Sequence, residues 1–121
     1  MKKRVLVVDD SPTDRQMVTT LLQKEGYAVT TAIDGEDALQ KIAAEQPPLV
    51  VLDIVLPKMN GYQVLRQLKA APETRGIKVI LVSSKNQESD RFWGLKQGAD
   101  EYIAKPYPDD ELLNEIGRAH V

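Results

Sequence analysis

Four short apolar runs in this sequence each end at charged or hydroxyl side chains. The runs are Val5–Val8, Leu49–Leu52, Val79–Val82 and Tyr102–Ala104, and the residues after them are Asp9-Asp10, Asp53, Ser83-Ser84 and Lys105-Pro106. Apolar runs of this length are typical of strands that are buried on both faces of a parallel sheet. Ligands bind at the carboxyl edge of such a sheet. The sequence therefore predicts that three carboxylates, a hydroxyl and an ammonium meet in one pocket.

Helical patterns separate the strands along the whole chain. We expect strands near 5–8, 28–32, 49–52, 79–82 and 101–104, with helices at about 12–25, 36–46, 61–70, 88–97 and from about 108 onward. The segment 28–32 is less apolar than the other strands, which favours a place at the edge of the sheet. Alternation of this kind predicts an α/β fold of the (βα)5 type, in which a doubly wound parallel sheet of five strands is covered on both faces. We expect one domain over residues 1–121.

The composition excludes several classes of function. The net charge of −2 argues against direct, non-specific binding of nucleic acid. The basic start, Met1–Arg4, is followed by four apolar residues and two aspartates, which is too short for a secretory signal peptide. No apolar run approaches the roughly 20 residues of a membrane span. We expect a cytoplasmic protein without membrane insertion, and the absence of cysteine is compatible with a reducing compartment.

The acidic strand ends suit a divalent metal and a phosphoryl group. Adjacent carboxylates such as Asp9 and Asp10 repel each other unless a cation lies between them, and Mg²⁺ prefers oxygen ligands of this kind. Asp53 could complete the metal site or act as a nucleophile toward phosphorus. The loop after Asp53 contains Pro57 and Asn60-Gly61, so the carbonyl of Val55 could turn toward the metal.

The other two strand ends supply groups that bind phosphoryl oxygens. The Ser83 hydroxyl can donate a hydrogen bond, and Lys105 carries a compact positive charge. Each of these residues, taken alone, is more often a capping acid, a junction serine or an exposed lysine. These ordinary structural roles do not explain why four of the five strands end in groups that suit one Mg²⁺-phosphate site.

The motifs together resemble the receiver domain of bacterial two-component response regulators. The resemblance covers essentially the whole chain and rests on Val7-Val8-Asp9-Asp10, on Asp53 with Pro57 and Gly61, on Ser83, and on Gly98-Ala99-Asp100 leading to Lys105-Pro106. It implies a flavodoxin-like sheet with strand order 2-1-3-4-5. Two departures from the family pattern are Ser83, where threonine is common, and Ser84, which is larger than the usual alanine or glycine.

The resemblance also implies a role for each site residue. Asp53 would be the phosphoacceptor and, with Asp10 and the carbonyl of Val55, a direct ligand of Mg²⁺. Asp9 would lie nearby and act partly through water, and Lys105 would pair with a phosphoryl oxygen.

Ser83 would bind the phosphoryl group, and Tyr102 would then swing inward as the aromatic switch residue. The surface formed by the fourth helix, the fifth strand and the fifth helix would change shape for an output protein. A sensor histidine kinase would be the phosphodonor, and the domain would catalyse only its own phosphorylation and dephosphorylation.

The segment 83–94, with adjacent Phe92 and Trp93, looks more like single-domain regulators of chemotaxis, twitching motility and phototaxis than like flagellar ones. Phe92 and Trp93 lie about 100° apart on a helix, so at most one of them is expected to face the core. The exposed one could be an anchor for a partner or be covered by a neighbouring loop. We expect a monomer or a weak dimer.

Two alternatives remain at this point. The chain could be a receiver cut from a larger DNA-binding regulator or hybrid kinase. It could also be a Mg²⁺-dependent phosphatase of the haloacid dehalogenase type, although that class requires a second aspartate two residues after its nucleophile. In this sequence Asp9 and Asp10 are adjacent, and Val55 stands two residues after Asp53.

Overall fold

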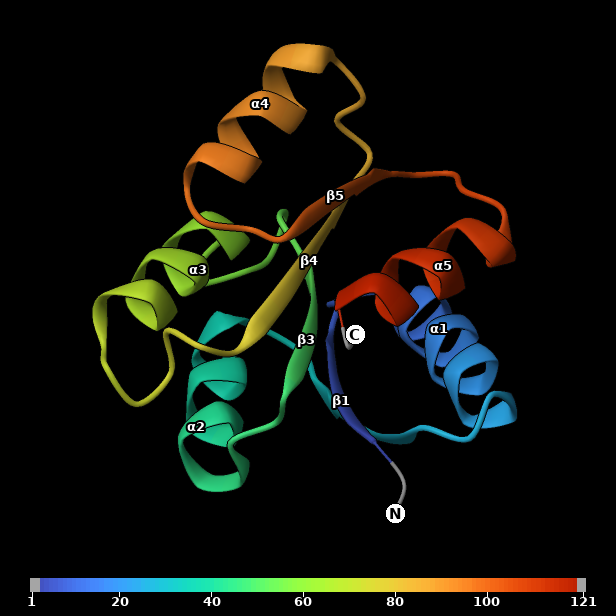
Figure 1. Cartoon of the computed structure of the whole chain (residues 1–121), viewed down its shortest axis with the longest axis horizontal. Helices are drawn as coiled ribbons and strands as arrows, with labels where there is room; N and C mark the ends of the chain where they lie inside the picture. The colour runs from blue at the N-terminus through green and yellow to red at the C-terminus, as the bar shows by residue number, and fades with distance from the viewer. Residues whose placement is uncertain (1–2, 120–121) are drawn as a thin grey trace.

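Five parallel strands form the centre of the molecule, and helices cover both faces of the sheet (Figure 1). The computed structural model describes residues 3–119. The strands are β1 (Arg4–Val8), β2 (Ala28–Ala32), β3 (Leu49–Asp53), β4 (Lys78–Ser83) and β5 (Glu101–Ala104). The helices are α1 (Pro12–Lys24), α2 (Gly35–Glu45), α3 (Gly61–Ala70), α4 (Glu88–Lys96) and α5 (Asp109–Ala119).

The strand order β2-β1-β3-β4-β5 confirms the predicted fold class and topology. β2 lies at one edge of the sheet, as its more polar sequence predicted. β3 lies at the centre, and all five of its residues are buried. β3 and β4 each continue one residue further than expected, so Asp53 and Ser83 are the last residues of their strands. The site residues on these strands are therefore held by sheet pairing rather than by loops.

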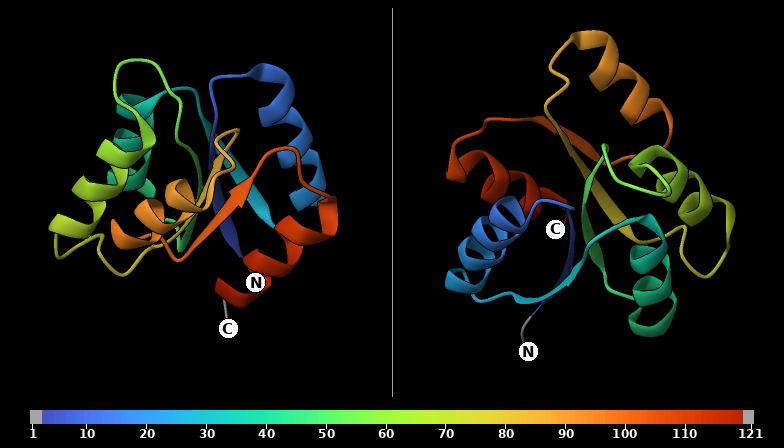
Figure 2. Two further views of the ribbon diagram at one scale, coloured as in Figure 1. Left: turned by 90° about the horizontal axis from the view of Figure 1, so that it is seen from above. Right: turned by 180° about the vertical axis from the view of Figure 1, so that it is seen from behind.

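Alternate residues of each strand point to opposite faces and build two separate apolar clusters. Leu6 and Val8 of β1 pack in one cluster with residues of α2 and α3, while Val5 and Val7 pack in the other with residues of α1 and α5. The views in Figure 2 show α1 and α5 together on one side of the sheet and α2, α3 and α4 on the other. This arrangement follows from the two-residue period of a strand whose two faces are both buried.

Local signals set the helix boundaries. α1 begins at the N-cap Ser11, whose hydroxyl accepts a hydrogen bond from the Asp14 amide at 3.3 Å, with Pro12 as the first helical residue. α2 begins at Gly35, one residue earlier than expected, because Asp34 is its N-cap and the Asp34 carboxylate accepts a hydrogen bond from the Asp37 amide at 2.7 Å. Within residues 3–119, no helix is long and apolar enough to cross a membrane.

Among the described residues, α4 has fewer buried positions than any other helix. It ends at Lys96, one residue before the predicted end, and Gly94 is its one buried residue. A Cβ atom on Gly94 would lie 2.9 Å from the Tyr102 ring and 3.0 Å from Leu81, so the helix backbone approaches the sheet closely at this point. Phe92 and Trp93 are 64% and 49% exposed, so neither of them faces the core.

We predict that Gly61→Ala lowers the free energy of unfolding by about 1–3 kcal/mol, the usual cost of forcing extra atoms into a packed site. A Cβ atom at Gly61 would collide with the Asp53 carbonyl oxygen and lie 2.8 Å from the Ile54 Cα. Gly117→Ala is the matched control, because nothing lies within 4 Å of a Cβ atom at that position of α5. It should stabilise the protein by about 0.5–1 kcal/mol. Urea unfolding measures both effects, and equal stabilities for the two variants would contradict the prediction.

Candidate functional site

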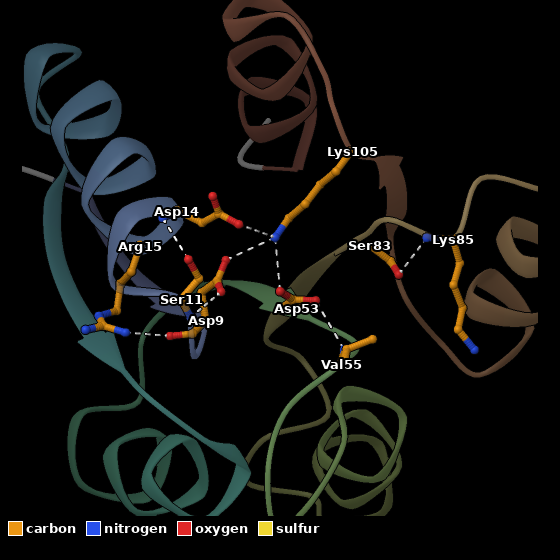
Figure 3. Close-up of polar contacts among 9 residues, drawn as sticks. All are labelled: Asp9, Ser11, Asp14, Arg15, Asp53, Val55, Ser83, Lys85 and Lys105. Atoms are coloured by element: carbon orange, nitrogen blue, oxygen red, sulfur yellow. Dashed lines mark hydrogen bonds and ion pairs between the residues drawn. The ribbon is translucent and has the colours of Figure 1, made fainter.

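Polar side chains from four strand ends gather at the carboxyl edge of the sheet (Figure 3). Asp53 ends β3 and Ser83 ends β4, while Asp9 follows β1 and Lys105 comes directly after β5. The carboxylates of Asp9, Asp10 and Asp53 each offer an oxygen within 4.8 Å of the others. The sheet register pairs Asp53 with Val82, which places Ser83 on the neighbouring strand beside the acidic cluster. The structure therefore brings together the strand-end residues that the sequence singled out.

The Lys105 ammonium lies at the centre of this group. Its Nζ donates to Oδ2 of Asp53 at 3.0 Å and to Oδ2 of Asp9 at 3.2 Å. It also donates to Oδ2 of Asp14 on α1, at 3.2 Å. Charged hydrogen bonds of this kind are about twice as strong as neutral ones. Lys105 thus connects β1, α1, β3 and β5 through one side chain.

The backbone around Asp53 is held tightly. Its Oδ1 accepts a hydrogen bond from the Val55 amide at 3.2 Å, and the Gly61 amide donates to the Ile54 carbonyl at 2.8 Å. α3 begins directly after this contact at the N-cap Asn60, where a capping box fixes the first turn. The Val55 side chain is exposed, and ligation of a metal by its carbonyl remains a prediction.

The acidic cluster combines two buried carboxylates with one exposed carboxylate. Asp9 and Asp53 are buried, whereas Asp10 is exposed. Asp9 is held in place because its Oδ1 accepts from the Ser11 amide at 3.0 Å and its carbonyl accepts from Arg15 at 2.8 Å. Carboxylate oxygens so close together form a set of donors that suits a hard divalent cation.

Burial and charge shift the protonation of both central residues. Burial raises the pKa of the Asp53 carboxyl above 3.8, and nearby Asp9 adds to this, while the hydrogen bond and charge of Lys105 act in the opposite direction. Burial alone would lower the pKa of Lys105. Its hydrogen bond and charge interaction with Asp53, followed by those with Asp9, outweigh burial and raise that pKa. Lys105 therefore stays positively charged, and the ionised form of Asp53 is held at an energetic cost.

The Ser83 end of the site connects to Tyr102. Ser83 is fully buried, and its hydroxyl accepts a hydrogen bond from the Lys85 amide at 3.1 Å. The Tyr102 hydroxyl donates to the Lys85 carbonyl at 2.7 Å. The Tyr102 ring is 6% exposed and packs against Gly94, so it occupies the inward position in this structure. The expected swing between two positions remains a prediction.

Asp14 and Arg15 both contact the site from the first turn of α1, and neither residue was predicted from the sequence. Asp14 binds the Lys105 ammonium, and Arg15 binds the Asp9 carbonyl. Topology alone places the first turn of α1 at this edge of the sheet, because the helix follows β1 directly, but it does not say which side chains of that turn reach the site. The Asp14 side chain is 45% exposed, whereas those of Asp9 and Asp53 are 7% and 10% exposed.

Comparison with known proteins identifies the class. The chain belongs to the response regulator receiver domain family, whose model matches residues 5–117. Receiver domains take phosphoryl groups from histidine kinases and bind downstream effectors. The chain is therefore a signalling domain of two-component systems rather than a classical enzyme, and the phosphatase alternative is wrong.

Individual relatives cover most of the chain. Protein PilH of Pseudomonas aeruginosa is 44% identical over 113 residues, which are 93% of this chain and 93% of PilH. Protein PilG of the same organism is 43% identical over 118 residues, which are 98% of this chain and 87% of PilG. Among solved structures, the CheX–CheY–BeF3–Mg²⁺ complex from Borrelia burgdorferi contains a chain with a TM-score of 0.92 and 30% identity. That match covers 98% of this chain and 90% of the other.

The raised pKa of Asp53 predicts a pH-dependent difference between the wild type and Asp53→Asn in the absence of metal. Above that pKa the buried carboxylate is ionised and destabilises the wild type, so the neutral variant should unfold at a higher temperature. Below it, Asp53 is protonated in the folded protein and the advantage of the variant should disappear. Thermal unfolding in EDTA between pH 7 and pH 4 measures this difference. A lower melting temperature for the variant at pH 7 would contradict the assignment.

Proposed function

We propose that this chain is a phosphorylation switch in which Asp53 accepts a phosphoryl group from the phosphohistidine of a sensor histidine kinase. The observation that carries the proposal is the contact of Lys105 with Asp53 at 3.0 Å, beside the carboxylates of Asp9 and Asp10. The proposal is supported because a carboxylate that would act as the nucleophile, a positive charge and a set of oxygens that suit a divalent cation all lie at one edge of the sheet. The domain would catalyse its own phosphorylation and dephosphorylation without turning over a separate substrate.

The positions of Asp53, Lys105 and the acidic cluster suggest how the phosphoryl group is transferred. An Asp53 carboxylate oxygen attacks the phosphorus in line, the bond between phosphorus and the donor nitrogen breaks, and the histidine leaves with the bonding electrons. Lys105 offsets the negative charge that reaches the site on the phosphoryl oxygens. Mg²⁺, held by Asp10, Asp53 and the carbonyl of Val55 with Asp9 nearby, would supply the further positive charge that this transfer requires.

The response would run from Ser83 to the outer surface. Ser83 would donate its hydroxyl to the phosphoryl group, which changes its contact with the Lys85 amide. The Lys85 carbonyl accepts a hydrogen bond from the Tyr102 hydroxyl. A shift of the loop between β4 and α4, which contains Lys85, would therefore move the Tyr102 ring and then α4. The face formed by α4, β5 and α5 would bind an output protein in one of the two states.

Control of chemotaxis or surface motility is the proposed pathway. The support is the extent of the match to PilH and PilG, each of which is covered over most of its length. A receiver within a larger DNA-binding regulator or hybrid kinase is the second candidate. The proposed Mg²⁺ site, phosphoacceptor and output face are the same in both cases.

We expect the wild type to become phosphorylated by acetyl phosphate and Mg²⁺, and Asp53→Asn to take up no detectable phosphoryl group. The amide lacks the nucleophilic carboxylate oxygen. Intact-protein mass spectrometry measures the uptake. Asp110→Asn is the control, because Asp110 is exposed on α5 and is not one of the clustered carboxylates. Uptake by Asp53→Asn at the wild-type rate would reject the proposal.

We also expect Mg²⁺ to stabilise the wild type against thermal unfolding. A ligand that binds only the folded state adds about 1.4 kcal/mol when its concentration is ten times Kd. Asp10→Asn removes one carboxylate of the cluster and should reduce this gain, whereas Asp110→Asn should retain it. A melting temperature that does not respond to Mg²⁺ in the wild type would argue against the metal site.

A further inference from the structure

Lys105 has three carboxylate partners, and this number limits what else it can bind. An ammonium group carries three N–H donors. In this structure one donor each is available for Asp9, Asp14 and Asp53, at 3.2, 3.2 and 3.0 Å. A phosphoryl oxygen can therefore bind Lys105 well only if one of these contacts is given up.

Asp14 is the partner that can be released with the least loss. Its side chain is 45% exposed, and exposed ion pairs contribute little to stability. Asp9 and Asp53 are buried and have further hydrogen bonds to the Ser11 and Val55 amides. Within residues 3–119, Lys105 is the one hydrogen-bond partner of the Asp14 carboxylate.

The surroundings of Asp14 leave room for this release. Its backbone is fixed by the Ser11 cap, but its side chain lines a groove of about 600 Å³ between α1 and the loop that joins β5 to α5. Lys105 and Asp109 line the same groove. The carboxylate can thus turn into open space while the helix remains in place.

We propose that Asp14 is a positioning residue that competes with the phosphoryl group for Lys105 and thereby slows phosphorylation of Asp53. This inference rests on the proposed function. Asp14 holds Lys105 toward α1, and the lysine reaches the phosphoryl oxygens fully only after that contact breaks. Removal of the Asp14 charge should leave one ammonium donor free for the incoming group.

The test measures phosphorylation by acetyl phosphate and, separately, the affinity for beryllofluoride at fixed Mg²⁺ by calorimetry. In the first reaction Asp53 attacks phosphorus and acetate leaves with the electrons of the broken P–O bond. We expect Asp14→Asn to raise both the rate constant and the affinity by roughly two- to fivefold, as the loss of one exposed ion pair implies. Asp14→Ser, which also lacks the charge, should behave in the same way.

Asp109→Asn is the matched control. It removes a negative charge from the same groove, but the Asp109 carboxylate has no ion pair with Lys105 among the described residues. Both readouts should stay near the wild-type values in this variant. If Asp14→Asn matches either the wild type or Asp109→Asn in rate or affinity, the inference is wrong. If the wild type itself takes up no phosphoryl group on Asp53, the proposed function fails instead.

Discussion

The crowding of negative charge around Lys105 is the constraint on which the whole site depends. Two unit charges 4 Å apart interact with about 4 kcal/mol at an effective dielectric constant of 20. Asp9, Asp10 and Asp53 offer oxygens within 4.8 Å of one another, so a single ammonium offsets their repulsion only in part. Burial raises the pKa of the Asp53 carboxyl, and the charge of Asp9 adds to this rise. An unbalanced site of this kind is prepared to bind a cation.

The fold can accommodate the cost of these crowded carboxylates because it confines them to the carboxyl edge of the sheet. β3 is buried along its whole length, and each face of the sheet packs against its own set of helices. Such strands have no place for a charged group except at their ends. Two extensive apolar clusters therefore stabilise the domain, while the charged groups of the proposed site lie at the ends of the strands.

The sequence predicted the parts of the site that follow from topology. Asp9, Asp53 and Lys105 come directly at strand ends, and parallel strands bring such positions together whatever the details of the loops. Asp14 was not predicted because the direction of its side chain depends on how the Ser11 cap orients the first turn of α1. No periodic pattern in the sequence marks Asp14, so its contact with Lys105 could be recognised only in the three-dimensional structure.

The exposure of both Phe92 and Trp93 also could not be predicted from the sequence. Helical geometry predicted only that at most one of these two side chains faces the core, and in the structure neither does. α4 instead meets the sheet through Gly94, against Tyr102 and Leu81. A glycine gives no hydrophobic signal in a sequence, so the buried side of α4 could not be recognised from residue types.

The segments on the two sides of Asp53 differ in how closely they pack. Toward α3, the Gly61 backbone lies directly against the Asp53 carbonyl, and the capping box at Asn60 leaves that junction little freedom. Toward α4, the connecting residues 84–87 are exposed, and the helix rests on a single buried glycine. A shift that followed phosphorylation of Asp53 would therefore meet the closely packed junction with α3 on one side and the less buried helix α4 on the other.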